Sequence, residues 1–125
     1  MADLNYLKRI NDTYGHEKGN EYIFGACHEM CLIFNHSPIF RIGGDEFVIL
    51  LERLDYLNRN SLLTNLELIF DKSANDKTKE PWQQYSVALG MASFDPATDL
   101  SIEDVFKRAD KRMYENKQKM KAARE

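Results

Sequence analysis

Residues 41–47 read Arg41-Ile42-Gly43-Gly44-Asp45-Glu46-Phe47, and this stretch decides the fold because it separates two β-forming runs. Ile39 to Ile42 reads as a strand, and Phe47 to Leu51 is apolar and rich in β-branched residues. The segment therefore predicts a β-hairpin whose tight turn uses the two glycines. Glycine also lets a ligand approach the backbone without a Cβ atom in the way, while Asp45 and Glu46 project carboxylates from the turn. Taken alone, the turn is also typical of a structural hairpin with solvated acids.

Helical periodicity flanks the hairpin on both sides. Residues 5 to 14 predict a short helix, which a longer helix follows. After the hairpin, Leu63 to Phe70 predict a third helix and Tyr85 to Phe94 alternate as a strand does. Ser101 with Asp104 resembles the capping box of a last helix. This order predicts an α/β or α+β sandwich, in which a mixed central sheet is covered by helices, with residues 1–125 forming one domain.

The composition limits the classes of function. Seventeen Lys and Arg against twenty Asp and Glu give a net charge of −3, which argues against a general nucleic-acid binder. The longest apolar runs are five residues each, far shorter than the roughly 18 that a membrane span needs. The amino end lacks the pattern of a signal peptide, so we expect a cytoplasmic protein without membrane contact. Residues 107 to 125 hold eight basic and three acidic side chains, which alone read as a solvated helix face.

An acidic group near the amino end gives Asp45 a potential partner. If Asp3 ends a strand beside the hairpin, the two carboxylates come within reach of one Mg²⁺, a hard cation that takes carboxylate and phosphate oxygens. Lys8 lies one turn into the neighbouring predicted helix, where its ammonium can face the rest of a triphosphate. Lys117 and Lys121, four residues apart, place two more ammonium groups on one helical face. Together these residues suggest a nucleotide site.

Three motifs occur together in the chain: Asp3-Leu4-Asn5 continued by Lys8 to His16, then Arg41 to Phe47, then Arg108-Ala109-Asp110 with Tyr114 and Lys117. From Asp3 to about Lys121 the chain thereby resembles the GGDEF domain, the catalytic module of diguanylate cyclases. The resemblance implies a nucleotide cyclase-like fold and the condensation of two GTP molecules into cyclic di-GMP with release of two pyrophosphates. It also implies a homodimer, because each subunit holds one GTP and the two sites must face each other.

The resemblance assigns metal-binding and catalytic roles. Asp3 and Asp45 would bind Mg²⁺ or Mn²⁺ through their side chains and Leu4 through its carbonyl, and Glu46 would join the metal shell. Asp45 would also remove the proton from the attacking 3′-hydroxyl, with Glu46 beside it. Lys8 would neutralise the charge that builds on the phosphates in the transition state.

The resemblance also assigns the residues that bind the substrate. Lys117 and Lys121 would bind the outer phosphates of GTP, and Gly43 and Gly44 would lie against the nucleotide. Asn11 and Asn20 occupy the positions that read guanine. Asn20 stands where the family usually has Asp, so it presents a donor to a guanine donor, a mismatch of roughly 1–3 kcal/mol if buried.

Two further departures from the family concern regulation and completeness. Residues 21 to 40 contain no Arg and no Lys, so the Arg-x-x-Asp product site of many members is missing and we expect no product inhibition through it. Only Met1 and Ala2 precede Asp3, where the family has a helix and a core strand. We therefore expect the first helix and most of the first core strand to be missing, and the truncated chain to be inactive if nothing compensates.

Those departures leave alternatives open. The chain reads either as a fragment of a longer protein with an upstream sensory domain, or as a domain that rearranges or swaps elements between subunits. A catalytically inactive GGDEF-like domain that binds GTP or a protein partner as a sensor is the main rival to the enzyme. A structural module with an incidental Gly-Gly hairpin is the third possibility.

Overall fold

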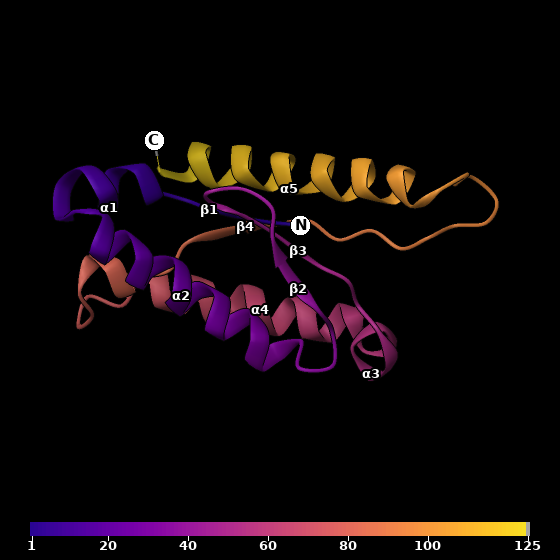
Figure 1. The fold of residues 1–125 in the computed structure, drawn as a ribbon, viewed down its shortest axis with the longest axis horizontal. Helices are drawn as coiled ribbons and strands as arrows, with labels where there is room; N and C mark the ends of the chain where they lie inside the picture. The colour runs from indigo at the N-terminus through magenta and orange to yellow at the C-terminus, as the bar shows by residue number, and fades with distance from the viewer. Residues whose placement is uncertain (125) are drawn as a thin grey trace.

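The computed structural model describes residues 1–124 as three layers, with the last helix on one face of a small sheet and two long helices across the other (Figure 1). The elements in chain order are β1 (Ala2–Leu4), α1 (Leu7–Tyr14), α2 (His16–Ile33), β2 (Ile39–Arg41), β3 (Glu46–Ile49), α3 (Arg53–Leu57), α4 (Arg59–Ala74), the 3₁₀ helix η1 (Pro81–Gln83), β4 (Val87–Leu89) and α5 (Ile102–Arg124). The long helix α5 covers one face, while α2 and α4 lie across the other. This arrangement confirms the predicted sandwich of sheet and helices.

The four strands follow the order β2-β3-β1-β4, so the amino-terminal strand is central. Every pairing that the structure describes is antiparallel, and in this the sheet differs from the mixed sheet expected. Asp3 lies opposite Glu46 on β3 and opposite Ala88 on β4. The predicted condition for a metal site, a strand at Asp3 beside the hairpin, is therefore met.

The hairpin forms where it was predicted, but its turn does not depend on the conformational freedom of glycine. Neither Gly43 nor Gly44 has a positive φ. The Ile42 amide donates to the Glu46 carbonyl at 3.0 Å, and the Arg41 guanidinium donates to the carbonyls of Gly43 and Gly44 at 3.1 and 2.8 Å. The arginine thus closes the turn. No described atom outside the turn lies within 4 Å of a Cβ built on Gly44, which leaves that surface open to a ligand.

The core lies between the sheet and the pair α2 and α4. Tyr22, Leu4, Met30 and Leu66 are its largest fully buried side chains. The Tyr22 hydroxyl donates to the Asn5 carbonyl at 2.7 Å and accepts from the Ser86 amide at 3.0 Å. This one buried hydroxyl therefore joins α2 to the ends of β1 and β4.

The strand predicted over residues 85–94 is limited to β4, because the chain beyond it pairs with α5 instead of with a strand. Arg112 donates to the Met91 carbonyl at 2.7 Å, and Arg108 donates to the Ser93 carbonyl. Gly90 allows the close approach, since an added Cβ would lie 2.2 Å from the Met113 nitrogen. Backbone carbonyls that a sheet would use are thereby taken by arginine side chains.

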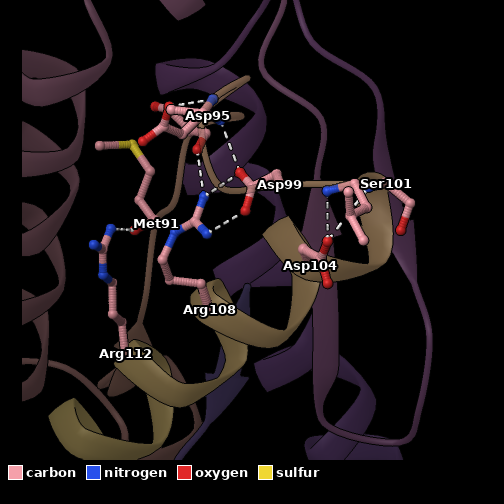
Figure 2. A network of polar contacts seen from close by, with 10 residues as sticks. Met91, Asp95, Asp99, Ser101, Asp104, Arg108 and Arg112 are labelled. Atoms are coloured by element: carbon pink, nitrogen blue, oxygen red, sulfur yellow. Dashed lines mark hydrogen bonds and ion pairs between the residues drawn. The ribbon is translucent and has the colours of Figure 1, made fainter.

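A network of polar contacts holds the following loop on the start of α5 (Figure 2). Arg108 makes a bidentate ion pair with the buried Asp99, at 2.7 and 2.8 Å. Asp99 also accepts from the Asp95 amide at 2.7 Å. Asp104 accepts from the Leu100 amide at 2.7 Å and from the Ser101 amide at 3.4 Å, which is the half of the predicted capping box that the carboxylate provides. These contacts set the position of α5 over the sheet.

The amino end lies beside Gly90, with which the backbone of Met1 exchanges two hydrogen bonds of 3.0 Å. Burial lowers the pKa of the Met1 ammonium. Just beyond this point an apolar cavity of about 350 Å³ lies between residues 48–52, residues 89–94 and α5. Within residues 1–124, none of the helices combines the length and the apolar character needed to cross a membrane.

Candidate functional site

Three carboxylates meet at the end of the sheet where β1 leads into α1. Asp3 is in β1, Glu46 begins β3 opposite it, and Asp45 comes one residue earlier. The Leu4 amide donates to the Asp45 carbonyl at 2.8 Å, so the last residue of the turn is bonded to the end of β1. The antiparallel register thus brings residues about 40 positions apart in the chain to one place.

Asp3 is the most enclosed of the three. Its Oδ2 accepts from the Lys117 ammonium at 2.8 Å, and that lysine reaches it from α5. Its Oδ1 is buried and has no hydrogen-bond partner among the described residues. An unpaired buried carboxylate oxygen is costly, so this atom is a position at which a cation would be stabilised.

Burial and like charges shift the titration of this cluster. Burial raises the pKa of the Asp3 carboxyl, the Lys117 hydrogen bond lowers it, and the Asp45 carboxylate raises it again. Burial also raises the pKa of Glu46, and the charges of Asp3, Asp45 and Asp110 add to that rise. The neighbouring negative charges thus add to the effect of burial on the pKa of Asp3 and of Glu46.

A groove of about 630 Å³ opens beside the carboxylates. Its lining comes from the β1–α1 connection, the hairpin turn and the end of α5: Leu4, Asn5, Tyr6, Leu7, Lys8, Arg9, Asp45, Lys117, Lys121 and Arg124. Five of these ten residues are Lys or Arg. One carboxylate at the edge of a basic groove is the charge pattern that a phosphate group bound through a metal requires.

The start of α1 adds backbone donors to this groove. Tyr6 precedes the helix in the left-handed conformation, with φ 69° and ψ 8°, which costs a non-glycine residue about 1–2 kcal/mol. No side chain among residues 1–124 caps the first turn of α1. The free amides of a helix amino end favour an anion, and residues 6–9 line the groove.

The structure places the predicted phosphate-binding lysines in this groove. Lys117 and Lys121 both line it. Lys8 lines it as well, although its ammonium is paired with Asp12 at 2.7 Å and its side chain is 89% exposed. This lysine is free to exchange its partner, since an exposed pair of this spacing contributes little.

The predicted guanine-reading residues lie outside the groove lining, on α1 and α2. Asn11 packs against Gly19, because an added Cβ there would stand 1.7 Å from the Asn11 Oδ1. Asn20 follows Gly19 directly and is exposed. The two asparagines therefore lie on adjoining helices, with Asn11 in contact with Gly19, the residue before Asn20.

Five groove residues were given no site role from the sequence: Asn5, Tyr6, Leu7, Arg9 and Arg124. Arg124 carried a recognisable signal, because it follows Lys117 by seven residues and so shares its helical face. Tyr6 carried none, since its position depends on a left-handed backbone. In the structure the Arg124 guanidinium lies 4.6 Å from the centre of the Tyr6 ring.

The donor set fits a hard divalent cation only with help from other ligands. Among residues 1–124 no three His, Cys, Asp or Glu side chains are arranged to hold a metal by themselves. A cation at Asp3 and Asp45 would therefore also take backbone and substrate oxygens. The unpartnered Asp3 Oδ1 and the all-oxygen chemistry of the carboxylates suit Mg²⁺ or Mn²⁺.

Comparison with known proteins gives one consistent result. Residues 1–123 match the family described as "Diguanylate cyclase, GGDEF domain". The diguanylate cyclase DgcM of Escherichia coli K12 is 31% identical over 119 residues, which cover 94% of this chain and 27% of that protein. This chain therefore spans about a quarter of that relative's length.

Solved structures agree with this match. The active GGEEF domain of a diguanylate cyclase from Vibrio cholerae superposes with a TM-score of 0.78 at 27% identity, covering 94% of this chain and 74% of that one. The GGDEF domain of DgcB from Caulobacter crescentus, solved in complex with c-di-GMP, gives a TM-score of 0.70 at 25% identity, covering 94% and 69%. Sequence and fold thus point to the same group of proteins.

Proposed function

This chain belongs to the GGDEF domain family of diguanylate cyclases, and from that premise we propose that it condenses two GTP molecules into cyclic di-GMP and releases two pyrophosphates. One observation carries the proposal: a buried carboxylate with an unpartnered oxygen, Asp3, lies beside Asp45 at the edge of a basic groove. That combination serves a nucleoside triphosphate that binds together with a divalent cation.

Asp3, Asp45 and the Leu4 carbonyl would hold Mg²⁺ or Mn²⁺, with Glu46 beside them. The ion would offset phosphate charge and polarise the α-phosphate toward attack. The buried Asp3 can serve such an ion without further rearrangement of its own strand, because β1 is paired on both sides. Binding of the triphosphate, recognition of guanine and removal of the proton would be carried out by side chains of the protein.

The basic groove would hold the triphosphate. Lys117 and Lys121 reach it from one face of α5, while Lys8 and Arg9 reach it from the first turn of α1. The uncapped amides of that turn would add donors at a positive helix end. Positioning and charge stabilisation dominate phosphoryl-type transfer, so these groups would supply much of the catalysis.

Guanine would be read by Asn11 and Asn20. Asn11 lies against Gly19, the residue that precedes Asn20. Gly43 and Gly44 would lie along the nucleotide at the open side of the turn.

The reaction requires two copies of the site. The 3′-oxygen of each GTP attacks the α-phosphorus of the other, and the bond from that phosphorus to the bridging β-phosphate oxygen breaks, so two pyrophosphates leave. Asp45 would accept the proton of the attacking hydroxyl. We therefore propose a homodimer with the two grooves facing each other, in a cytoplasmic protein whose sensory domain controls that contact.

Incubation with GTP and Mg²⁺, followed by chromatography for cyclic di-GMP and pyrophosphate, tests the proposal. Wild type should form both products, with two pyrophosphates for each cyclic di-GMP, and Asp45→Ala should form neither. Glu67→Ala is the matched control, because Glu67 is an exposed acid on α4, away from the groove lining. It should react as wild type does.

The same assay distinguishes the enzyme from a sensor. Binding of GTP by wild type without either product would contradict the proposed reaction and favour a domain that only binds nucleotide. If Asp45→Ala formed product at the wild-type rate, the proposed catalytic role of the Asp3 and Asp45 carboxylates would be wrong.

A further inference from the structure

Lys117 lies beside the place that a cation would take at Asp3. Its ammonium lies 2.8 Å from the Asp3 Oδ2, and the lysine and aspartate side chains are 33% and 10% exposed. Lys117 also lines the basic groove with Lys121. One ammonium is therefore within reach of two sites, the carboxylate that would bind a cation and the groove that would bind phosphate.

We propose that Lys117 exchanges Asp3 for a phosphate when nucleotide binds, so that the lysine excludes the divalent cation from the free site and phosphate binding releases that exclusion. The inference rests on the proposed function, because it needs a cation at Asp3 and a triphosphate in the groove. It makes Lys117 a positioning residue that couples the two ligands.

Charge explains why the lysine and the cation compete. A divalent ion binds a carboxylate oxygen at about 2.0 to 2.6 Å. It would then stand within a few ångströms of an ammonium that is 2.8 Å from the other oxygen of the same group. Like charges at that separation repel in a partly buried place, where solvent screens them weakly.

The buried Asp3 carboxylate needs a positive partner, which either Lys117 or a divalent cation can provide. Lys117 is the one cation paired with Asp3 among the described residues, and its ammonium lies 2.8 Å from the Asp3 Oδ2. Removing the lysine leaves the buried Asp3 without a positive partner among the described residues. A divalent cation supplies such a partner and also reaches the unpartnered Oδ1.

The second partner of Lys117 follows from its place on α5. The flexible stem of a lysine lets its ammonium move several ångströms without a change in the helix. Lys121 lies one turn further along the same face of α5 and lines the same groove, yet no ion pair joins it to a carboxylate among the described residues. A comparison of the two lysines therefore distinguishes two effects: only Lys117 can exclude a cation from Asp3, whereas both can attract a phosphate to the groove.

Titration with Mn²⁺ alone, followed by calorimetry or by the loss of the free-ion EPR signal, tests the inference without reference to activity. Lys117→Met should bind Mn²⁺ at least about tenfold more tightly than wild type, a change of about 1.4 kcal/mol. Lys121→Met should change the affinity much less, although it removes the same charge from the same groove. Lys119→Met, an exposed lysine on α5 outside the groove lining, is the control for the helix.

A nucleotide arm tests the exchange itself. At a saturating concentration of a non-hydrolysable GTP analogue, wild type and Lys117→Met should bind Mn²⁺ with similar affinity, because Lys117 has then left Asp3. A tenfold difference that persists unchanged in the presence of the analogue would overturn the exchange.

The remaining outcomes are also decisive. Equal tightening of Mn²⁺ binding by Lys117→Met and Lys121→Met would show a general effect of charge and overturn the specific competition. An Mn²⁺ affinity that Lys117→Met leaves unchanged would also overturn it. Asp3→Asn tests the proposed function separately, since it should abolish the Mn²⁺ site. If Asp3→Asn left Mn²⁺ binding intact, the metal site itself would be wrong, and the inference would fall with it.

Discussion

Asp3 and Glu46 lie directly opposite each other across β1 and β3. Side chains of directly opposed residues project from the same face of a sheet, so the two carboxylates share the face that α5 covers. Like charges in this arrangement destabilise the fold, and their pKa values are raised.

Glu46→Gln should therefore make the protein more stable at neutral pH. Because the pKa of Glu46 is raised in the folded state, its ionisation costs stability as the pH rises above the ordinary value of a glutamate. The mutant should exceed wild type in Tm at pH 7, and the difference should shrink as the pH is lowered toward 4. A gain in Tm that is the same at both pH values would show that charge is not its cause.

Gly90→Ala should destabilise the protein by about 1–3 kcal/mol, the usual cost of overpacking. The added Cβ would stand 2.2 Å from the Met113 nitrogen and 2.3 Å from the Ala109 carbonyl oxygen. Both are backbone atoms of α5, so the helix must move away from β4. Urea denaturation measures the loss.

Gly44→Ala is the matched control for that measurement. No described atom beyond the turn approaches its added Cβ within 4 Å, and its φ is not positive, so we expect an unchanged midpoint. A wild-type midpoint for Gly90→Ala would contradict the close packing of α5 on β4.

Tyr22→Phe should cost about 1–3 kcal/mol, because it leaves the buried Ser86 amide and Asn5 carbonyl without their partner. The ring volume is unchanged, so the loss reports the hydroxyl alone. Thermal unfolding followed by circular dichroism measures it. Tyr114→Phe, on an exposed ring of α5, should leave Tm unchanged, and equal effects of the two substitutions would refute the role of the buried hydroxyl.

The Arg108–Asp99 pair should contribute to acid sensitivity. The Arg108 hydrogen bonds, helped by the Asp95 amide, lower the pKa of Asp99 to about 2. A group with a depressed folded pKa stabilises the protein above its ordinary value and loses that effect as the pH falls through the folded value. Asp99→Asn should thus be less stable than wild type at pH 7, and the difference should narrow between pH 4 and pH 2.

Urea denaturation at a series of pH values checks this prediction. Asp12→Asn serves as the control, since Asp12 lies in an exposed pair with Lys8, and surface pairs of this kind contribute little. A difference between Asp99→Asn and wild type that stays constant down to pH 2 would mean that the ion pair does not depend on the charge of Asp99.

Asn20→Asp should tighten the binding of GTP by about tenfold. A carboxylate accepts from both guanine donors, whereas the asparagine amide opposes one of them with a donor of its own, a mismatch of roughly 1–3 kcal/mol. Calorimetry with GTP and with ATP measures affinity and selectivity together. Asn65→Asp, an equally exposed site on α4, controls for the added charge, and an unchanged GTP affinity in Asn20→Asp would remove Asn20 from the guanine site.

Much of the fold was predictable because its signals are local. The hairpin around Gly43 and Gly44 and the last helix, which Ser101 and Asp104 indicate, depend on the order of a few neighbouring residues, which the sequence pattern reports directly. The strand β1 could not be predicted outright, because its three residues are too few to show the alternation of a strand, and it entered the sequence analysis only as a condition for the metal site. The strand over 85–94 was predicted too long, because the carbonyls of Met91 and Ser93 pair with arginines from α5.

The candidate site divides in the same way. Lys117 and Lys121 could be placed on one face from their spacing, whereas the left-handed Tyr6 that opens α1 toward the groove had no local signal. The role of Arg108 was also hidden, because its partner Asp99 belongs to an irregular loop. Long-range pairing of this kind depends on which elements the core brings together.

The order of amino acids alone predicted the hairpin, the four longer helices and the family, because each of these depends on residue type and spacing. Only the tertiary structure decided that Asp3 meets Lys117 across 114 positions and that one oxygen of Asp3 is left without a partner. These contacts depend on the register between the strands and on the position of α5 over the sheet. Both result from the packing of the whole chain.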